Sequence, residues 1–372
     1  MAVFIILTVG TCAHIAEYII YMYMGIIGEG SYGCVMKPSL PCKNKTVSYK
    51  NKISKWMLSE SAVKEVQEYA LVGQADKNAE FSTGQPIRCS IKENASTLKA
   101  ISKCKLNKKF KNKTMKQIGA ETALLIIKDG GLDLEKWVKQ KSDKKGIKDF
   151  WHEAIRLFRG IKVFQEYDLV HHDIKPQNIV YMEKTRRVNY IDFGLMRSLK
   201  TEAAKCRNIN RCHANPHWNY PTDVFLMDKD FFADLEKKTA KQRRELFDAY
   251  IDNLKAKSET KFVSAFYTML KYVGVSKEDK ARLHERHMTD FRELLMTPGS
   301  FDEYLDKALA GFDVFGLGLT LLYVLGRVKP FMEVRTVQAM EDLFIRMMTP
   351  NVYKRPTITQ AEAEYERILS DM

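Results

Sequence analysis

Short apolar runs separated by glycine and lysine dominate the first third of the chain. Residues 25–37 (GIIGEGSYGCVMK) are typical of two strands joined by a glycine turn. Residues 51–57 (NKISKWM) alternate as a strand does, and residues 122–128 (TALLIIK) are apolar enough for a buried strand. Residues 61–72 carry apolar side chains at helical spacing. The lysine-rich stretch 107–116 is predicted to be an exposed loop or hairpin.

The pattern turns helical from about residue 133. Residues 134–140 and 150–167 have apolar positions three and four apart, which predicts amphipathic helices. Residues 178–193 return to a β pattern around the polar turn EKTR, which predicts a hairpin. Everything beyond residue 223 is predicted to be helical. The fold class is therefore α+β, a small β-rich half followed by a large helical half with a cleft between two lobes.

The amino-terminal segment 1–23 is strongly apolar but lacks the features of a leader or a membrane span. It has no basic residues of the kind that begin a secretory signal, and His14 and Glu17 interrupt the apolar run. Helix packing, an anchor, or translation that begins at Met22 or Met24 all remain open. A segment that does not span a membrane is favoured, and membrane contact through residues 2–23 is possible but not favoured.

Composition narrows the class of protein only a little. Apolar residues make up 45% and charged residues 28%, which is the balance of a globular protein. The net charge of +14 suggests acidic partners such as nucleotide phosphates, but a specific nucleic-acid partner is not favoured. The seven cysteines form no CxxC pair, which predicts reduced thiols and a cytoplasmic protein. Cys206, Cys212, His213 and His217 could be drawn as a zinc site, but the spacing fits no familiar pattern and plain loop residues are favoured.

A glycine-rich turn is the first candidate site. Gly28, Gly30 and Gly33 lie between two predicted strands, with Val35 just after them. Glycine lets a backbone close over a phosphate chain that side chains would block. Taken alone, the signal is weak and an ordinary hairpin is the better interpretation. The strand-turn-strand setting argues against a dinucleotide fold, in which the third glycine opens a helix.

The second candidate site lies in the stretch VHHDIKPQNIVYM (170–182) and in IDFGL, which follows it. Asp173 could accept the proton of an attacking hydroxyl, and Lys175 could neutralise charge on a transferred phosphoryl group. Asn178 and Asp192 could hold a divalent ion against phosphates, because magnesium prefers few carboxylates plus phosphate oxygens. Any one of these residues could simply cap a turn. All four together, after a glycine loop and before helices, argue against chance.

These stretches resemble a eukaryotic-type protein kinase over roughly residues 24–368. GEGSYGCV resembles the glycine-rich loop, HHDIKPQN the catalytic loop, and Asp192–Gly194 the Asp-Phe-Gly motif. DVFGLG (Asp313–Gly318) resembles the helix whose aspartate ties down the catalytic loop. KRP, with Arg355, resembles the arginine that pairs with the acidic end of the activation segment. That end is normally Ala-Pro-Glu, and here NYPTD offers Pro221 and Asp223.

The resemblance implies a bilobal kinase fold that binds ATP between its lobes. The N-lobe and hinge would span residues 24–132 and the C-lobe 133–372, with the hinge backbone near Lys128 and Asp129. A helical insertion at about 224–309 is interpreted as a solvated decoration rather than a substrate-recognition element. The implied cofactors are ATP and Mg²⁺, with Mn²⁺ as a substitute. The unusual lysine strand and inserted helices are similar in style to the divergent kinases of large DNA viruses.

The lysine that anchors phosphate in this family is expected to be Lys55, because it lies on a predicted strand just before a helix. Lys52 and Lys37 are the alternatives. The family pairs this lysine with a helix glutamate, for which Glu68 fits best, with Glu65 as the alternative. The choice of Glu68 depends on the apolar residues three and four positions later.

The expected activity is phosphoryl transfer to serine or threonine of protein substrates, since Lys175 follows Asp-Ile as in the Ser/Thr-specific members. A scaffold without turnover, a small-molecule kinase and a basic nucleic-acid-binding protein are the alternatives. His172 replaces the arginine that grips a phosphorylated activation loop, so activity is predicted not to depend on phosphorylation of Ser198 or Thr201. A cytoplasmic monomer is expected, in the host cytoplasm if the protein is viral.

Overall fold

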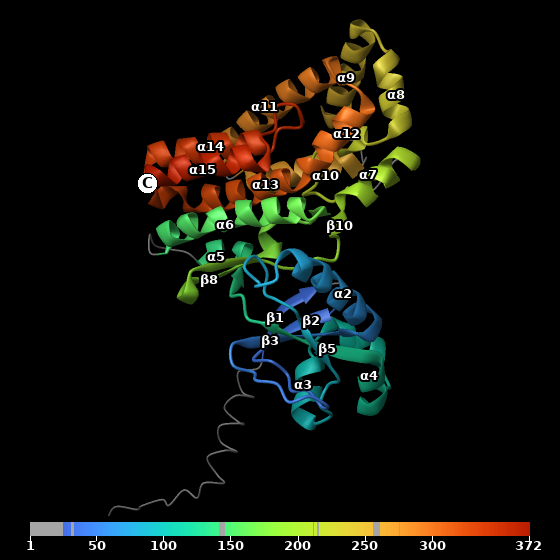
Figure 1. The fold of residues 1–372 in the computed structure, drawn as a ribbon, viewed down its shortest axis with the longest axis vertical. Coiled ribbons are helices and arrows are strands. Elements are labelled where there is room, and N and C mark those ends of the chain that lie inside the picture. The colour runs from blue at the N-terminus through green and yellow to red at the C-terminus, as the bar shows by residue number, and fades with distance from the viewer. Residues whose placement is uncertain are drawn as a thin grey trace, which may run out of the picture. The chain divides into compact units, whose positions relative to one another are not determined.

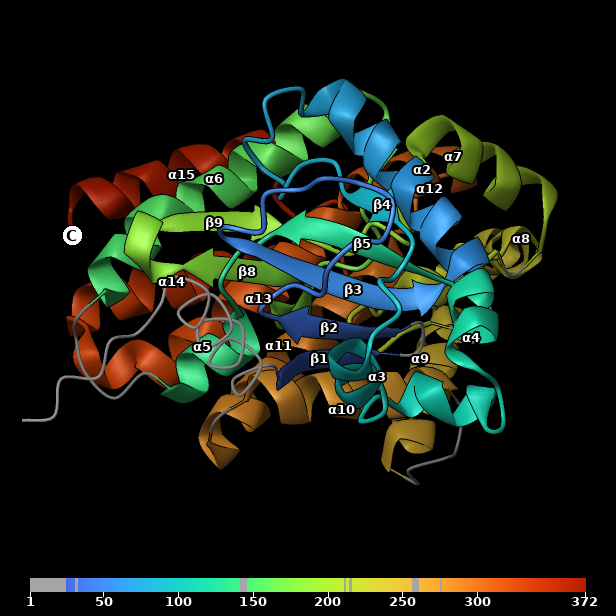
Figure 2. The same cartoon turned by 90° about the horizontal axis from the view of Figure 1, so that it is seen from below.

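The computed structural model describes residues 25–372, except 31–32, 141–145, 211, 214–215, 256–260 and 275, and it leaves out the side chains of 253–255 and 261–264. The apolar segment 1–23, predicted not to span a membrane, lies outside the described residues. The chain forms two compact units (Figures 1 and 2). The first contains the described residues up to 129 apart from 74–76 and 80–82, which belong to the second unit with residues 130–372.

An antiparallel five-stranded sheet forms the centre of the first unit. The apolar runs predicted four of its strands, but not the one at residues 87–89. Its order is β1-β2-β3-β5-β4. The strands are β1 (Gly25–Gly30), β2 (Gly33–Lys37), β3 (Lys52–Leu58), β4 (Ile87–Cys89) and β5 (Thr122–Lys128). Helix α2 (Ser59–Ala75) follows β3 directly. Because strand side chains alternate, Met57 and Leu125 face Ala62 of α2, while Trp56 and Leu124 belong to a separate cluster.

The lysine-rich segment after β4 is helical, so its prediction as a loop or hairpin is wrong. It forms α3 (Ala95–Ile101), the 3-10 helix η1 (Lys105–Phe110) and α4 (Met115–Glu121). Buried Leu106, Phe110 and Ile118 anchor it to the same hydrophobic cluster as Trp56. These buried apolar residues are separated by several lysines. The sequence therefore shows no clear helical spacing of apolar residues.

Six of the seven cysteines are paired, which contradicts the expected reduced thiols. The disulfides are Cys34–Cys104, Cys42–Cys89 and Cys206–Cys212. The paired cysteines of the first unit are 70 and 47 residues apart in the sequence, so no local spacing of cysteines predicts these disulfides. The sheet and the helical segment after it bring these cysteines together.

The second unit combines two small sheets with many helices. The predicted hairpin forms from β8 and β9, next to β6, while β7 pairs with β10. The bounds are β6 (Leu132–Asp133), β7 (Leu169–Val170), β8 (Ile179–Met182), β9 (Arg187–Tyr190) and β10 (Arg197–Ser198). The short 3-10 turns are η2 (Pro176–Asn178), η3 (Glu183–Thr185) and η5 (Lys329–Phe331).

Helix α13 (Phe312–Val328) passes through the core of this unit. Around it lie α5 (Leu134–Gln140), α6 (Ile147–Glu166), α14 (Val334–Met347) and α15 (Ile358–Ser370). Helix α15 runs beside α6 (Figure 2), and Tyr365 donates a 2.7 Å hydrogen bond to the carbonyl oxygen of Trp151. Among the described residues, Phe312–Phe331 is the one stretch long and apolar enough to cross a membrane, but most of it is buried in the protein, as in a core helix.

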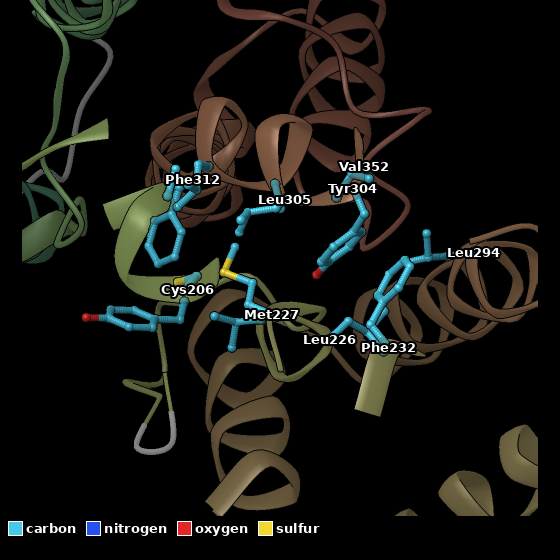
Figure 3. Packing of buried hydrophobic residues seen from close by; sticks show 14 of the residues in the cluster. Cys206, Leu226, Met227, Phe232, Leu294, Tyr304, Leu305, Phe312 and Val352 are labelled. Atoms are coloured by element: carbon cyan, nitrogen blue, oxygen red, sulfur yellow. The ribbon is translucent and has the colours of Figure 1, made fainter. Parts of the chain in front are cut away.

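The helices predicted for residues 224–309 form, but they are more than a surface decoration. They are η4 (Val224–Leu226), α8 (Lys229–Lys237), α9 (Ala240–Lys255), α10 (Lys261–Val273), α11 (Lys277–Met296) and α12 (Phe301–Ala310). Phe232, Leu294 and Tyr304 from this region share one buried cluster with Cys206 and Phe312 (Figure 3). Interpreting these helices as solvated is therefore wrong, since they help to build the hydrophobic core of the unit.

Candidate active site

The sheet of the first unit aligns three predicted nucleotide-binding residues. Gly28 is the register partner of Val35, and Val35 is the partner of Lys55, across β1, β2 and β3. Directly opposed residues of neighbouring strands place their side chains on one face of a sheet. The side chains of Val35 and Lys55 therefore lie on the same face, next to the position of Gly28.

Two glycines of the loop serve different purposes. A side chain at Gly33 would place its Cβ 2.2 Å from the carbonyl oxygen of Trp56, so the close approach of β3 requires glycine there. At Gly30, no described atom lies within 4 Å of such a Cβ. Packing therefore does not demand glycine at position 30, whereas close approach of a phosphate chain would. The tip between them, residues 31–32, lies outside the described residues.

Lys55 forms an ion pair with α2, but with the alternative glutamate. Its Nζ lies 2.6 Å from Oε2 of Glu65, and both side chains are largely buried. This contact corrects the predicted partner Glu68, because the buried face of α2 includes Ala62, Glu65 and Val72. Leu71, one of the two apolar residues on which the choice of Glu68 depends, is exposed.

The remaining candidate lysines occupy other positions. Lys37 pairs with Asp129 at 2.6 Å, beyond the end of β5 in the predicted hinge. Lys52 stands opposite Lys128 at the end of the sheet. Lys55 is therefore the candidate whose partner comes from helix α2.

The catalytic loop between β7 and β8 is fixed by a buried carboxylate of α13. Asp313 accepts hydrogen bonds from the backbone N–H groups of His171 (2.7 Å) and His172 (3.0 Å). Burial raises the pKa of Asp313, while His171 and these two donors act in the opposite direction. A Cβ at Gly316 would come 2.8 Å from the carbonyl oxygen of Ile174, so the next turn of α13 also packs directly against the loop. The DVFGLG stretch thus does what the resemblance implied.

Asp173 is the centre of a hydrogen-bonded cluster. Lys175 Nζ lies 2.8 Å and 2.7 Å from its two carboxylate oxygens, and Asn178 Nδ2 donates to Oδ2 at 2.7 Å. Asn219 Nδ2 donates to the other oxygen at 3.1 Å. Asp173 is 7% exposed. Four of its contacts are charge-assisted or amide hydrogen bonds, which hold the carboxylate in one orientation.

Asn219 is a positioning residue that the sequence did not single out. It belongs to NYPTD, in which only Pro221 and Asp223 were considered, and its side chain is buried. A polar residue two positions before the proline was the available signal. Its bond to Asp173 connects the activation segment to the catalytic loop.

Asp192 follows strand β9 and lies next to Asn178 along the hairpin. The backbone N–H of Ile191 donates to the carbonyl oxygen of Asn178 at 3.0 Å. Asp192 is exposed and has a positive φ of 62°, a conformation that aspartate tolerates better than most residues. Phe193 is fully buried, with its ring 5.2 Å from that of His171. The buried ring fixes the aspartate that precedes it.

The donor set fits a hard divalent cation. Asn178 uses its Nδ2 protons on Asp173, and among the described residues its amide oxygen accepts no hydrogen bond. That oxygen and the exposed Asp192 carboxylate are the ligand types that Mg²⁺ takes alongside phosphate oxygens. Asn178 and Asp192 are thus the residues that would hold the metal.

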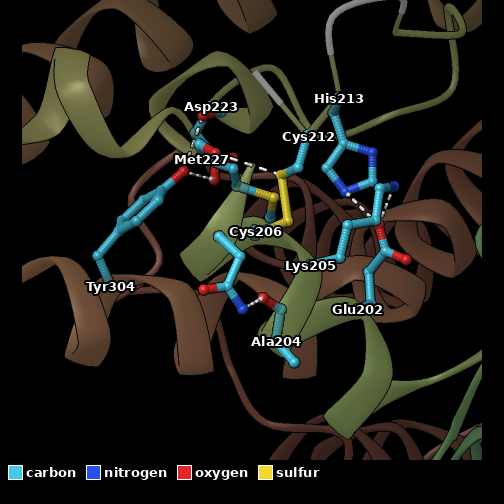
Figure 4. Close-up of a disulfide and its surroundings, with 10 residues drawn as sticks. Glu202, Ala204, Lys205, Cys206, Cys212, His213, Asp223, Met227 and Tyr304 are labelled. Carbon is cyan, nitrogen blue, oxygen red and sulfur yellow. Dashed lines mark hydrogen bonds and ion pairs between the residues drawn. A yellow bond between two sulfur atoms is a disulfide. The ribbon is translucent and has the colours of Figure 1, made fainter. Parts of the chain in front are cut away.

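The activation segment is anchored at both ends by side-chain contacts. At its start, Ser198 Oγ donates to Asp168 at 2.5 Å and caps α7 (Leu199–Asn208). At its end, Arg355 pairs with Asp223 at 2.7 Å, with both side chains almost completely buried. Tyr304 also donates to Asp223 (Figure 4). The shortened Pro-Thr-Asp ending therefore keeps the predicted ion pair.

His172 cannot replace the missing arginine as a cation. Its ring packs against Phe312 at 4.5 Å and His213 at 5.8 Å. Burial, followed by the nearby His213, lowers the pKa of His172 to about 3, so the ring is neutral at physiological pH. A phosphate group would find no positive charge on this side chain.

The structure brings together three of the four residues of the candidate zinc site. Ligand atoms of Cys206, Cys212 and His213 lie within 4.8 Å of one another, and in the described part of the chain His217 is not in this group. The two sulfur atoms are bonded to each other (Figure 4). They serve as a cross-link at the end of α7.

A comparison of the sequence with protein-family models finds a match. The sequence model of the family described as protein tyrosine and serine/threonine kinase matches residues 22–226, more than half of the chain. The chain belongs to this protein kinase family. A comparison with proteins of curated function finds no match.

Proposed function

We propose that the protein transfers the γ-phosphoryl group of Mg-ATP to serine or threonine side chains of proteins. The observation that carries this proposal is the cluster of Lys175, Asn178 and Asn219 around Asp173. A scaffold without turnover would need no carboxylate held in one orientation by three side chains. Family membership supports kinase activity in general, whereas the choice of substrate side chain depends on the loop itself.

Each residue of the loop has a chemical role in this proposal. Asp173 orients the substrate hydroxyl and accepts its proton as the new bond to phosphorus forms. Lys175, within hydrogen-bond distance of Asp173, stabilises negative charge on the phosphoryl group in flight. Bound magnesium supplies charge neutralisation of the phosphates, and Asn178 and Asp192 would hold it. Lys55, oriented by Glu65, binds the phosphates farther from the transferred group.

The test is phosphate transfer from labelled ATP with magnesium to generic protein substrates and to the chain itself. Asp173→Ala and Asp192→Ala should each abolish transfer, while Glu285→Ala removes an exposed carboxylate as a matched control and should not. Phosphoserine and phosphothreonine are the expected products. Phosphotyrosine alone would overturn the choice of substrate side chain. Thermal stabilisation by ATP without any transfer would instead establish the scaffold.

The place of action is proposed to be the cytoplasm, where ATP and protein substrates meet. The support is the ATP dependence that the family implies. The cysteines give no support, because six of the seven are paired. Fractionation of cells that express the full chain tests this proposal. Recovery in a secreted fraction would contradict it.

A further inference from the structure

Residues 94–120 of the first unit form an uninterrupted positive segment, defined here as the lysine segment. It contains eight lysines and no aspartate or glutamate. All eight lysine side chains are exposed on α3, η1, α4 and the turns between them. A field of one sign on this scale attracts polyanions.

Two lysines of the segment form ion pairs within the protein, and the charges of the other six are available to a binding partner. Lys105 pairs with Glu29 at 3.0 Å, and Lys113 pairs with Glu121. Within the described part of the chain, the other six form no ion pair, namely Lys99, Lys103, Lys108, Lys109, Lys111 and Lys116. Mutual repulsion of unpaired charges is an unfavourable feature for folding alone.

The segment is a folded surface, so its charges are held in place before any partner arrives. Phe110 and Ile118 are buried beneath it, and Thr114 and Gln117 form a capping box at the start of α4. The Cys34–Cys104 disulfide ties the segment to strand β2. A preorganised cationic face loses little conformational entropy on binding.

The chemistry of the segment indicates which polyanion it fits. Its cations are all lysine, whereas planar arginine is the residue that recognises single phosphates through two hydrogen bonds. Its one aromatic ring, Phe110, is buried, so no ring is offered for stacking on nucleic-acid bases. Hydrated point charges spread over a surface match the diffuse negative charge of a lipid bilayer. We propose that the lysine segment docks the protein on membranes that contain anionic lipids.

In the sequence, the apolar run 2–23 comes directly before β1. Glu29 of β1 accepts a hydrogen bond from the backbone N–H of Lys105. Stable membrane attachment generally takes two signals, such as one apolar group and one polybasic patch. The lysine segment supplies the polybasic patch.

The experiment is cosedimentation of the full chain with vesicles of phosphatidylcholine, with or without about 30% phosphatidylserine. The test variant replaces Lys103, Lys108, Lys109 and Lys111 by glutamine. The control variant makes the same change of charge at four exposed lysines of the second unit, Lys229, Lys237, Lys271 and Lys277. Thermal melts check that both variants are folded, and a third variant with arginine at the four test positions keeps the charge.

The chain should sediment with the phosphatidylserine vesicles and remain in solution with phosphatidylcholine alone. A lysine near an anionic surface is worth roughly fivefold in binding, so the test variant should bind at least tenfold more weakly. The control and the arginine variant should bind like the parent, and about 1 M salt should release the protein.

Three results would overturn the proposal. Equal binding to both vesicle types would assign attachment to apolar contacts. Equal losses in the test and control variants would assign it to net charge. Absence of vesicle binding together with lysine-dependent binding of duplex RNA or DNA would make nucleic acid the partner. None of these results depends on phosphoryl transfer.

Discussion

Replacing Arg355 by methionine should lower the free energy of unfolding of the second unit by about 3–5 kcal/mol. The guanidinium is 1% exposed and its partner Asp223 is 0% exposed, with 2.7 Å between Nη2 and Oδ1. Arg355 also donates to the carbonyl oxygen of Thr349 at 3.0 Å and 2.7 Å. Methionine fills similar space but leaves a buried carboxylate unpaired and that carbonyl oxygen without these donors. The cost is therefore that of an uncompensated buried charge.

The assay is urea denaturation with a parallel thermal melt. At about 2–4 °C per kcal/mol for a unit of this size, the melting temperature should fall by roughly 6–20 °C. Arg282→Met is the matched control, because Arg282 is 56% exposed and pairs with Glu341 on the surface. Exposed pairs are worth about 1 kcal/mol or less, so the control should change little.

A double-mutant cycle with Asp223→Asn isolates the pair itself. Each single change leaves one buried partner without its counter-charge, whereas the double variant removes both charges. The double variant should therefore lose less than the sum of the single losses, with a coupling of about 1–3 kcal/mol. If Arg355→Met cost no more than Arg282→Met, the ion pair would not anchor the end of the activation segment.

Three further predictions concern the ion pair of the first unit, pH and phosphorylation. Glu65→Gln should reduce kcat/KM for ATP-dependent transfer at least tenfold, while Glu68→Gln should stay near the parent, and the reverse order would restore the original choice of partner. Burial lowers the pKa of His287 to about 3. Below about pH 6.5, this side chain therefore binds a proton in the unfolded chain but not in the folded chain. Between about pH 6.5 and pH 5, His287 should contribute about 2 kcal/mol to the loss of stability. In urea titrations at both pH values His287→Gln should lack that share, while His172, whose pKa is also lowered to about 3, should add its own loss in both proteins. The double change of Ser198 and Thr201 to alanine should leave kinase activity in place at a cost of about 1 kcal/mol for the lost helix cap, and loss of activity in a folded double variant would show that phosphorylation matters.

The sequence was most informative where the signal is local. The alternation in residues 51–57 located the strand of Lys55, and the polar turn before residue 187 located the hairpin that ends at Asp192. Motif order was enough to predict that Asp313 would reach the catalytic loop, although 142 residues separate it from His171. Each of these inferences needs a period or a motif rather than a packing detail.

The features that the sequence did not predict share a different physical cause, because they depend on contacts between distant residues. Glu65 and Glu68 differ by less than one helical turn, and only packing reveals that Leu71 is 43% exposed. The partner of Cys34 lies beyond the intervening strands and helices, and Asn219 reaches Asp173 only through the path of the activation segment. Phe110 and Ile118 become visible as anchors only when the sheet beneath them is built.

The contact between Asp313 and the catalytic loop also bears on how this chain could diverge from its relatives. The carboxylate bonds to the backbone N–H groups at positions 171 and 172, not to their side chains. Mutation of residue 172 therefore leaves the anchor unchanged as long as the new residue accepts the φ of 63° found there. An arginine or a histidine at this position is compatible with the same backbone contacts, so a contact between residue 172 and a phosphate group can be lost while Asp173 stays in place. Regulation and chemistry are separable traits in such a loop, and selection can act on one without the other.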